Sequence, residues 1–213
     1  MSTGPALTTT SYAILGLLSV RPWSTYELAR QMDRSLGRIW PRAQSKLYEE
    51  PKKLVRLGLA EASKEAVGRR PRTVYSITAA GRRALAEWLQ QPGAGPVLES
   101  EQLLKVFFAD SGNRADTLAT LHAARNWAEE RNHGNTAAAQ AYLAGQGPFQ
   151  ERAAQTVLVG RFLTDYYRLV AKWAEWATAI VQQWPDHPAQ AAPDPTDIAE
   201  TLRRASWSAT DNE

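Results

Sequence analysis

The chain has 213 residues, of which 44% are hydrophobic and 9% aromatic, so it is long enough to bury a core in one or two domains. It contains no cysteine, which excludes disulfides, thiol catalysis and cysteine-ligated metal sites. The apolar run from Tyr12 to Val20 follows no basic segment and is too short to cross a bilayer. We therefore expect a cytoplasmic protein with no membrane partner.

The small net charge of +3 conceals a division of charge along the chain. Residues 1–92 hold 15 Lys and Arg against 7 Asp and Glu, a balance of +8, and the remaining residues hold 10 against 15, a balance of −5. This division suggests that the first part meets a polyanion such as nucleic acid. A basic surface that is merely solvated is the other interpretation of the charge alone.

Two short helices are predicted at the start of the basic part. Thr9 or Thr10 is placed to cap an apolar helix that Pro22 ends. Ser24 is placed to cap a second helix, because Glu27 follows it at the spacing of a capping box.

The following elements complete a recognisable order. A third helix runs on from Trp40, two strand-like segments at 59–67 and 72–78 flank a basic turn, and residues 79–91 form a fourth helix. Helix, helix, helix, hairpin and helix in succession are typical of a winged helix-turn-helix domain. We assign this domain to residues 1–92.

The third helix has two different faces and a proline in its middle. Projection at 100° per residue places Leu47, Pro51 and Leu54 on an apolar inner side, and the basic residues fall on the opposite side. A proline inside a helix costs roughly 3 kcal/mol. We expect the ring of Pro51 to be buried and the helix to kink near it.

The second part of the chain is predicted to be helical. Residues 93–98 form a Pro- and Gly-rich linker, residues 99–184 a domain of long helices, and residues 185–213 a mostly flexible tail with a short helix. The predicted fold class is therefore mostly α with a minor β component. Apolar and aromatic side chains recur every three or four residues in the most regular segment, at Leu158, Phe162, Tyr166, Leu169, Trp173, Trp176, Ile180 and Trp184.

Three interpretations of this aromatic stripe stay open. It is a coiled-coil-like interface with a second copy of the chain, a pocket for a small apolar or aromatic effector, or plain intramolecular core. A homodimer is favoured, because one winged helix reads only a few base pairs whereas two read a pseudo-palindrome.

No catalytic constellation is found in the sequence. His122 and His133 are roughly 16 Å apart along a helix, too far to share a metal ion, and neither a glycine-rich phosphate loop nor a nucleophile elbow occurs. We expect neither an enzyme nor a bound metal or cofactor.

The outer side of the third helix and the hairpin tip hold the candidate DNA contacts. A helix fits the major groove, where Arg, Lys and Gln bond base edges, and arginines at a wing tip suit the backbone or the minor groove. For Lys52 a general positive field is favoured over a direct contact, and for Tyr48 a phosphate contact is favoured over packing on the second helix. The candidates on these two elements are Arg42, Gln44, Ser45, Lys46, Tyr48, Lys52, Arg69, Arg70 and Arg72, and Tyr26 of the second helix is a further candidate.

The first domain resembles the PadR family of bacterial transcriptional regulators. The resemblance rests on "SYAILGLLSVRPWSTYELARQM", "IWPRAQSKLYEEPKKLVRLGLAE" and "GRRPRTVYSITAAGRRALAEWL", and residues 99 to about 184 resemble the virulence-activator-like C-terminal domain of one branch. It implies a homodimer, most often a repressor, and some relatives sense phenolic acids or drugs near the dimer interface. It also implies that Tyr48 and Tyr75 lie near phosphate, whereas Arg42, Gln44 and Lys46 vary with the operator.

The sequence thus predicts a homodimeric regulator that binds a pseudo-palindromic operator in double-stranded DNA and represses transcription. Release by a small apolar or aromatic effector remains open. The competing hypothesis is a basic interaction or scaffold protein that binds acidic partners without reading DNA sequence.

Overall fold

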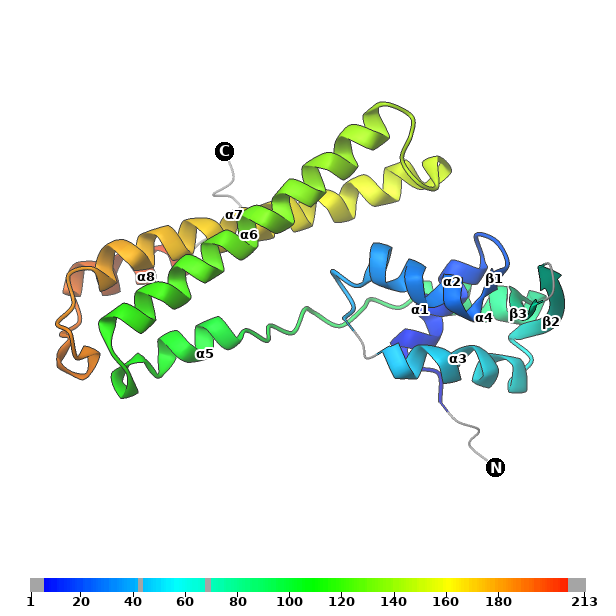
Figure 1. Ribbon diagram of the computed structural model, residues 1–213, viewed down its shortest axis with the longest axis horizontal. Helices are drawn as coiled ribbons and strands as arrows, with labels where there is room; N and C mark the ends of the chain where they lie inside the picture. Colours follow the sequence, from blue (N-terminus) through cyan, green and yellow to red (C-terminus); the bar gives the residue numbers. More distant parts are fainter. Residues whose placement is uncertain (1–5, 42–43, 68–69, 207–213) are drawn as a thin grey trace. The chain divides into compact units, whose positions relative to one another are not determined.

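A computed structural model of the chain describes residues 6–41, 44–67 and 70–206 (Figure 1). Side chains at 44–47, 66–67 and 70–71 fall outside the description. The chain divides into two compact units, Met1–Pro96 and Val97–Glu213. Each unit is described by itself below.

The first unit has the predicted winged-helix order, with two additions. A two-residue strand precedes the second helix, and a π-helical turn at Met32–Leu36 extends that helix. The three strands pair antiparallel in the order β1-β3-β2. The elements are α1 (Thr9–Leu18), β1 (Trp23–Ser24), α2 (Thr25–Gln31), α3 (Gln44–Arg56), β2 (Ala60–Val67), β3 (Arg70–Ile77) and α4 (Ala79–Leu89).

Side-chain caps fix where the first two helices begin. Ser24 and Glu27 form the predicted capping box: Ser24 N–H donates to Glu27 Oε2 at 2.8 Å, and Glu27 N–H donates to Ser24 Oγ at 3.3 Å. The cap of α1 is Thr8 rather than the predicted Thr9 or Thr10. Thr8 is preferred because the side chain of Ser11, three residues later, completes a second capping box.

The core of the first unit lies between α1, α2, α3 and the sheet. Ile14, Leu15, Leu18 and Leu28 are almost completely buried. Trp23 is buried as well, and its indole N–H donates to the carbonyl oxygen of Leu17 at 2.8 Å. This bond satisfies the polar atom of a buried ring and ties β1 to the end of α1.

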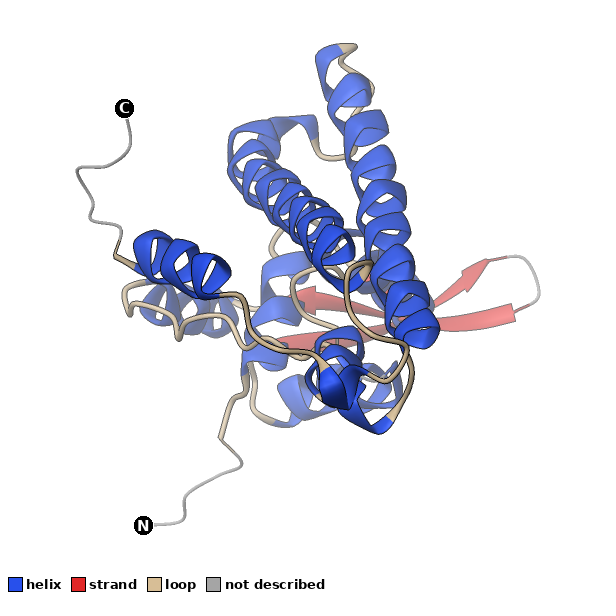
Figure 2. Cartoon of the chain, turned by 90° about the vertical axis from the view of Figure 1, so that its left-hand side faces the viewer, coloured by secondary structure: helices blue, strands red, loops and turns tan. Residues whose placement is uncertain are grey.

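The second unit is helical. Its elements are α5 (Glu101–Phe107), a 3₁₀ turn (Ala109–Ser111), α6 (Arg114–Leu143), two further 3₁₀ turns (Gln150–Arg152 and Pro188–Gln190), α7 (Ala153–Val181) and α8 (Pro195–Ala205). Helices α6 and α7 lie side by side as a long hairpin in both views (Figures 1 and 2). Among the described residues, no helix is both long enough and apolar enough to span a bilayer.

Helices α6 and α7 pack through an intramolecular seam of buried residues. The seam residues recur every three or four positions, which is the spacing of one helical face. Two clusters form it, one around Leu121 and Val181 and the other around Ala128 and Leu163. The buried seam residues are Thr117, Leu121, Ala124 and Ala128 on α6, and Leu163, Tyr167, Ala174, Ala177 and Val181 on α7.

Gly81 in the first turn of α4 permits a close approach to the segment that leaves α3. A Cβ at this position would overlap the carbonyl oxygen of Leu59 and lie 2.9 Å from Cγ1 of Ile77. Gly16 in α1 is different, since a Cβ there would meet nothing within 4 Å.

We expect Gly81→Ala to lower the free energy of unfolding by roughly 1–3 kcal/mol, because a backbone carbonyl must move. Gly16→Ala is the matched control and should be neutral or stabilising by up to ~1 kcal/mol, since alanine favours helix. Thermal unfolding followed by circular dichroism measures both changes. An unchanged melting temperature for Gly81→Ala would contradict the close packing of α4 on Leu59.

Candidate nucleic-acid interface

Helix α3 is seated on the first unit by an apolar inner face. Pro51 and Leu54 are fully buried, and α3 packs against α1, α2 and β2. The helix is unbroken from Gln44 to Arg56 (Figure 1), so Pro51 does not divide it into two helices. The ring of Pro51 is buried, as expected from the sequence. Its burial offsets part of the free energy that a proline costs inside a helix.

A polar network holds α3 beside the start of α1. Ser11 Oγ donates to Glu50 Oε2 at 2.8 Å, and Lys53 Nζ lies 3.6 Å from Glu50 Oε1. Lys53 Nζ also donates to the carbonyl oxygen of Ala6 at 3.0 Å, and its side chain is only 14% exposed. Lys53, which the projection places on the outer side, therefore anchors the helix and is not an open surface cation.

The outer face of α3 presents polar and basic side chains to solvent. Tyr48 is 45% exposed, and Lys52 and Arg56 are exposed as well. Glu49 accepts a hydrogen bond from Lys52 at 2.8 Å, which raises the pKa of Lys52 and lowers that of Glu49. Tyr26 on α2 is 68% exposed. These side chains are accessible to a partner on the outside of the unit.

The wing is linked to α2 through Arg72. Arg72 donates to Glu65 Oε2 across the hairpin at 3.0 Å, and its guanidinium lies 3.9 Å from Glu27 Oε2. The hydrogen bond from the Ser24 hydroxyl, the Ser24 backbone N–H and the charges of Arg21 and Arg72 lower the pKa of Glu27. Because Arg72 already contacts the carboxylates of Glu65 and Glu27, it would have to leave them in order to bind a phosphate.

Several candidate DNA contacts lie outside the described residues or side chains. Arg42 and Arg69 fall outside the described ranges. Gln44, Ser45 and Lys46 form the first turn of α3, but their side chains are not described. The same holds for Arg70, whose backbone opens β3.

Tyr75 does not fit the phosphate contact expected of it. The residue is 4% exposed, and β3 is the central strand of the sheet. Tyr75 pairs with Trp23 of β1 on one side and with Ala62 of β2 on the other. Residue 75 lies in the central strand because β1 adds a third strand to the sheet, which a two-residue segment does not reveal in the sequence.

The predicted aromatic stripe of the second unit separates into two groups. Four members face solvent with exposed fractions between 45% and 74%, namely Leu158, Phe162, Leu169 and Trp176, which we call the exposed α7 stripe. The other four are half-buried: Tyr166, Trp173, Ile180 and Trp184. Trp173 and Trp184 pack on the cluster around Leu121, so plain core accounts for part of the pattern.

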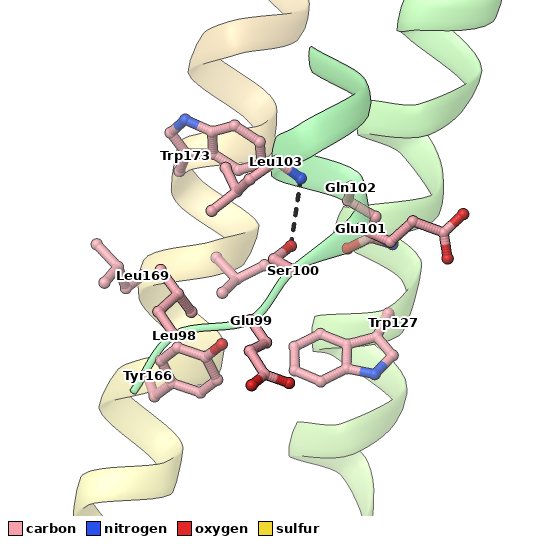
Figure 3. Close-up of a pocket in the computed structure, with 11 residues that line it drawn as sticks. Leu98, Glu99, Ser100, Glu101, Gln102, Leu103, Trp127, Tyr166, Leu169 and Trp173 are labelled. Carbon is pink, nitrogen blue, oxygen red and sulfur yellow. Dashed lines mark hydrogen bonds between the residues drawn. The ribbon is translucent and has the colours of Figure 1, made fainter. Parts of the chain in front are cut away.

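A pocket of about 510 Å³ lies between the start of α5 and helices α6 and α7 (Figure 3). Its walls include Trp127 from α6, and Tyr166 and Trp173 from α7. Leu98 and Glu99, which precede α5, also line the pocket, and Figure 3 shows Leu98 beside Tyr166 and Leu169. The sequence pattern identified Tyr166, Leu169 and Trp173. It missed Trp127, Leu98 and Glu99, because three separate segments meet here.

The two units together define a class: a winged-helix domain joined to a long helical hairpin, as in transcriptional regulators. The model of the transcriptional regulator PadR-like family matches residues 14–87, and that of the virulence activator alpha C-terminal domain matches residues 99–182. The chain belongs to the PadR-like family of transcriptional regulators. This is a family of regulators and not of enzymes.

Known proteins of this family resemble the chain in sequence and fold. The negative transcriptional regulator PadR of Bacillus subtilis is 30% identical over 107 residues, which span 49% of this chain and 59% of that protein. Its structure with operator DNA has a TM-score of 0.67 at 23% identity, covering 82% of this chain and 99% of the other. Its structure with p-coumaric acid has a TM-score of 0.64 at 22% identity, covering 84% and 99%. At these identities the structural likeness establishes the fold.

Proposed function

We propose that this chain is a sequence-specific DNA-binding repressor that acts as a homodimer on a pseudo-palindromic operator. One observation carries the proposal: α3 is fixed by a fully buried inner face and turns Tyr48, Lys52 and Arg56 outward. The helix belongs to a part of the chain whose residues 1–92 have a charge balance of +8. A rigid, exposed basic helix is suited to the major groove of DNA. Because the proposed target is chromosomal DNA, we expect the chain to act in the cytoplasm.

We divide the contacts between base reading and backbone binding. Arg42, Ser45 and Lys46 lie at or just before the first turn of α3, the part of a recognition helix that normally meets base edges. Tyr48 and the wing arginines are assigned to phosphates, which position the domain without reading sequence. The complex of the Bacillus subtilis relative with operator DNA supports DNA as the partner, and its description as a negative regulator supports repression.

Substitutions should separate the two kinds of contact. We expect Arg42→Ala or Lys46→Ala to weaken the free energy of binding to a selected DNA site by ~1–3 kcal/mol and to change the preferred DNA sequence. Arg70→Ala should lower the affinity for all DNA sequences by a similar factor. It should also reduce the slope of log affinity against log salt concentration by about 1. The control is Arg161→Ala in the second unit, which should leave affinity unchanged. Fluorescence anisotropy at several salt concentrations measures these effects.

Two outcomes would count against the DNA assignment. Unchanged binding after both kinds of substitution would remove α3 and the wing from the interface. Failure to shift random duplex DNA at ~50 mM salt would favour the scaffold alternative, because phosphate contacts are strong under that condition.

We assign dimerisation to the exposed α7 stripe. Leu158, Phe162, Leu169 and Trp176 are spaced by four, seven and seven residues, so they share one side of the helix. The α6–α7 seam uses a different side of α7. A row of large apolar side chains left in water is costly, and a second copy of the chain would cover it.

Charged substitutions in the stripe should disrupt the dimer. We expect Phe162→Glu combined with Leu169→Glu to shift the chain from dimer to monomer at micromolar concentration, because two charges would be buried unpaired. Arg168→Glu, exposed on another side of α7, is the control and should remain dimeric. Sedimentation velocity gives the masses. A double variant that stays dimeric would exclude the stripe as the interface.

The pocket beside α5 is our candidate effector site. Its volume of about 510 Å³ suits a small organic molecule, and aromatic and aliphatic side chains form much of its wall. The structure of the Bacillus subtilis relative with p-coumaric acid supports the idea that a regulator of this fold takes a small aromatic ligand.

A further inference from the structure

The effector pocket has an aromatic wall of partly exposed rings. Trp127 and Tyr166 meet edge to face, with ring centroids 6.2 Å apart. Trp173 lies farther along the same side, and Leu169 stands between Tyr166 and Trp173 in the chain (Figure 3). Tryptophan and tyrosine rings attract cations through their negative faces. The guanidinium carbon of Arg131 already lies 5.9 Å from the centroid of the Trp127 ring.

The charged residues on the pocket wall are all acidic. Of the lining residues, only Glu99 and Glu101 bear a formal charge. Glu101 is neutralised locally by Lys105, which donates to it at 2.9 Å and lowers its pKa. Figure 3 shows the Glu101 carboxylate turned away from Tyr166 and Leu169.

Glu99 differs from Glu101 in position and in partners. It lines the pocket, and the view in Figure 3 draws its carboxylate on the side of Tyr166 and Trp127, whose rings contact each other edge to face. In the part of the chain that the structure describes, no ion pair involves Glu99. The pocket therefore combines an unneutralised negative charge with aromatic faces, which is the composition of a cation site.

We infer that this pocket selects an organic cation with apolar or aromatic substituents over an anion of the same shape. The inference rests on the proposed effector role of the pocket and names the class of its ligand. A cation gains attraction from Glu99 and from the ring faces, whereas a carboxylate ligand would meet a like charge beside those rings. The selectivity thus differs from that expected of a site for a phenolic acid.

A pair of ions with the same shape and opposite charge provides the test. Tetraphenylphosphonium and tetraphenylborate are titrated into the full chain without DNA, and isothermal calorimetry measures each dissociation constant. We expect the cation to bind at least about tenfold more tightly than the anion. Equal binding, tighter binding of the anion, or no binding of either ion would overturn the inference.

Two isosteric substitutions locate the effect. Glu99→Gln should reduce the cation preference to less than about threefold, because it removes the charge and keeps the shape. Glu101→Gln is the matched control, since it removes an equal charge that Lys105 already neutralises, and it should keep the preference. If Glu101→Gln removed the preference as well, the general acidity of the second unit would be its source and the assignment to Glu99 would be wrong.

DNA binding is measured on the same preparations to keep this inference separate from the proposed function. A chain that binds DNA but shows no cation preference would overturn only the ligand class. A chain that shows the preference but binds no DNA would overturn the regulator proposal and leave the pocket assignment standing.

Discussion

The buried inner face of α3 is the constraint on which the rest of the first unit depends. Pro51 and Leu54 are fully buried against the neighbouring helices and β2. The bond from Ser11 to Glu50 and the contact of Lys53 with the Ala6 carbonyl add directional restraints to this apolar contact. Because the inner face is fixed, the rotation of the helix about its axis is fixed too, and the side chains that face outward follow from it. A proline is tolerated here because its ring takes part in that burial.

The wing is positioned by charge as well as by strand pairing. Strand β3 pairs with β2 and with the short β1, and Trp23 in β1 anchors this edge to α1. Arg72 connects the hairpin to Glu27, which also caps α2. The start of α2 and the wing therefore share one carboxylate, and this couples the orientation of the hairpin to the helix-turn-helix. In our proposal, such a coupling restrains the wing before DNA is bound and so would lower the entropic cost of binding.

Local signals in the sequence were sufficient for much of the fold. The spacing of Ser24 and Glu27 identified the second helix, and alternation around a basic turn identified the hairpin. Tyr75 shows the limit of such signals, because its place in a central strand depends on a two-residue strand with too few residues to form a pattern. Lys53 shows another limit, since helical projection places its Cα but not the path of its long side chain. Part of the pocket wall was missed, because Glu99 and Trp127 are brought to the residues of α7 only by tertiary packing.

The second unit explains how one long helix can serve two contacts. One side of α7 forms the seam with α6, and a neighbouring side presents the exposed α7 stripe to a second copy of the chain in our proposal. The aromatic pattern in the sequence does not distinguish these two sides of α7. Half-buried residues such as Trp173 and exposed ones such as Trp176 recur in it with the same period. In the same proposal, dimerisation dictates the form of the DNA site, since a twofold axis in the protein would require a twofold axis in the operator.

Selection of binding sites from a random duplex DNA library by the full chain tests the central claim most directly. Our account predicts enrichment of an inverted repeat whose half-site centres are separated by about 10–10.5 base pairs or a multiple of that spacing. Enrichment of a single unsymmetrical site, or no enrichment at moderate salt, would contradict a dimeric winged-helix regulator that reads DNA through α3.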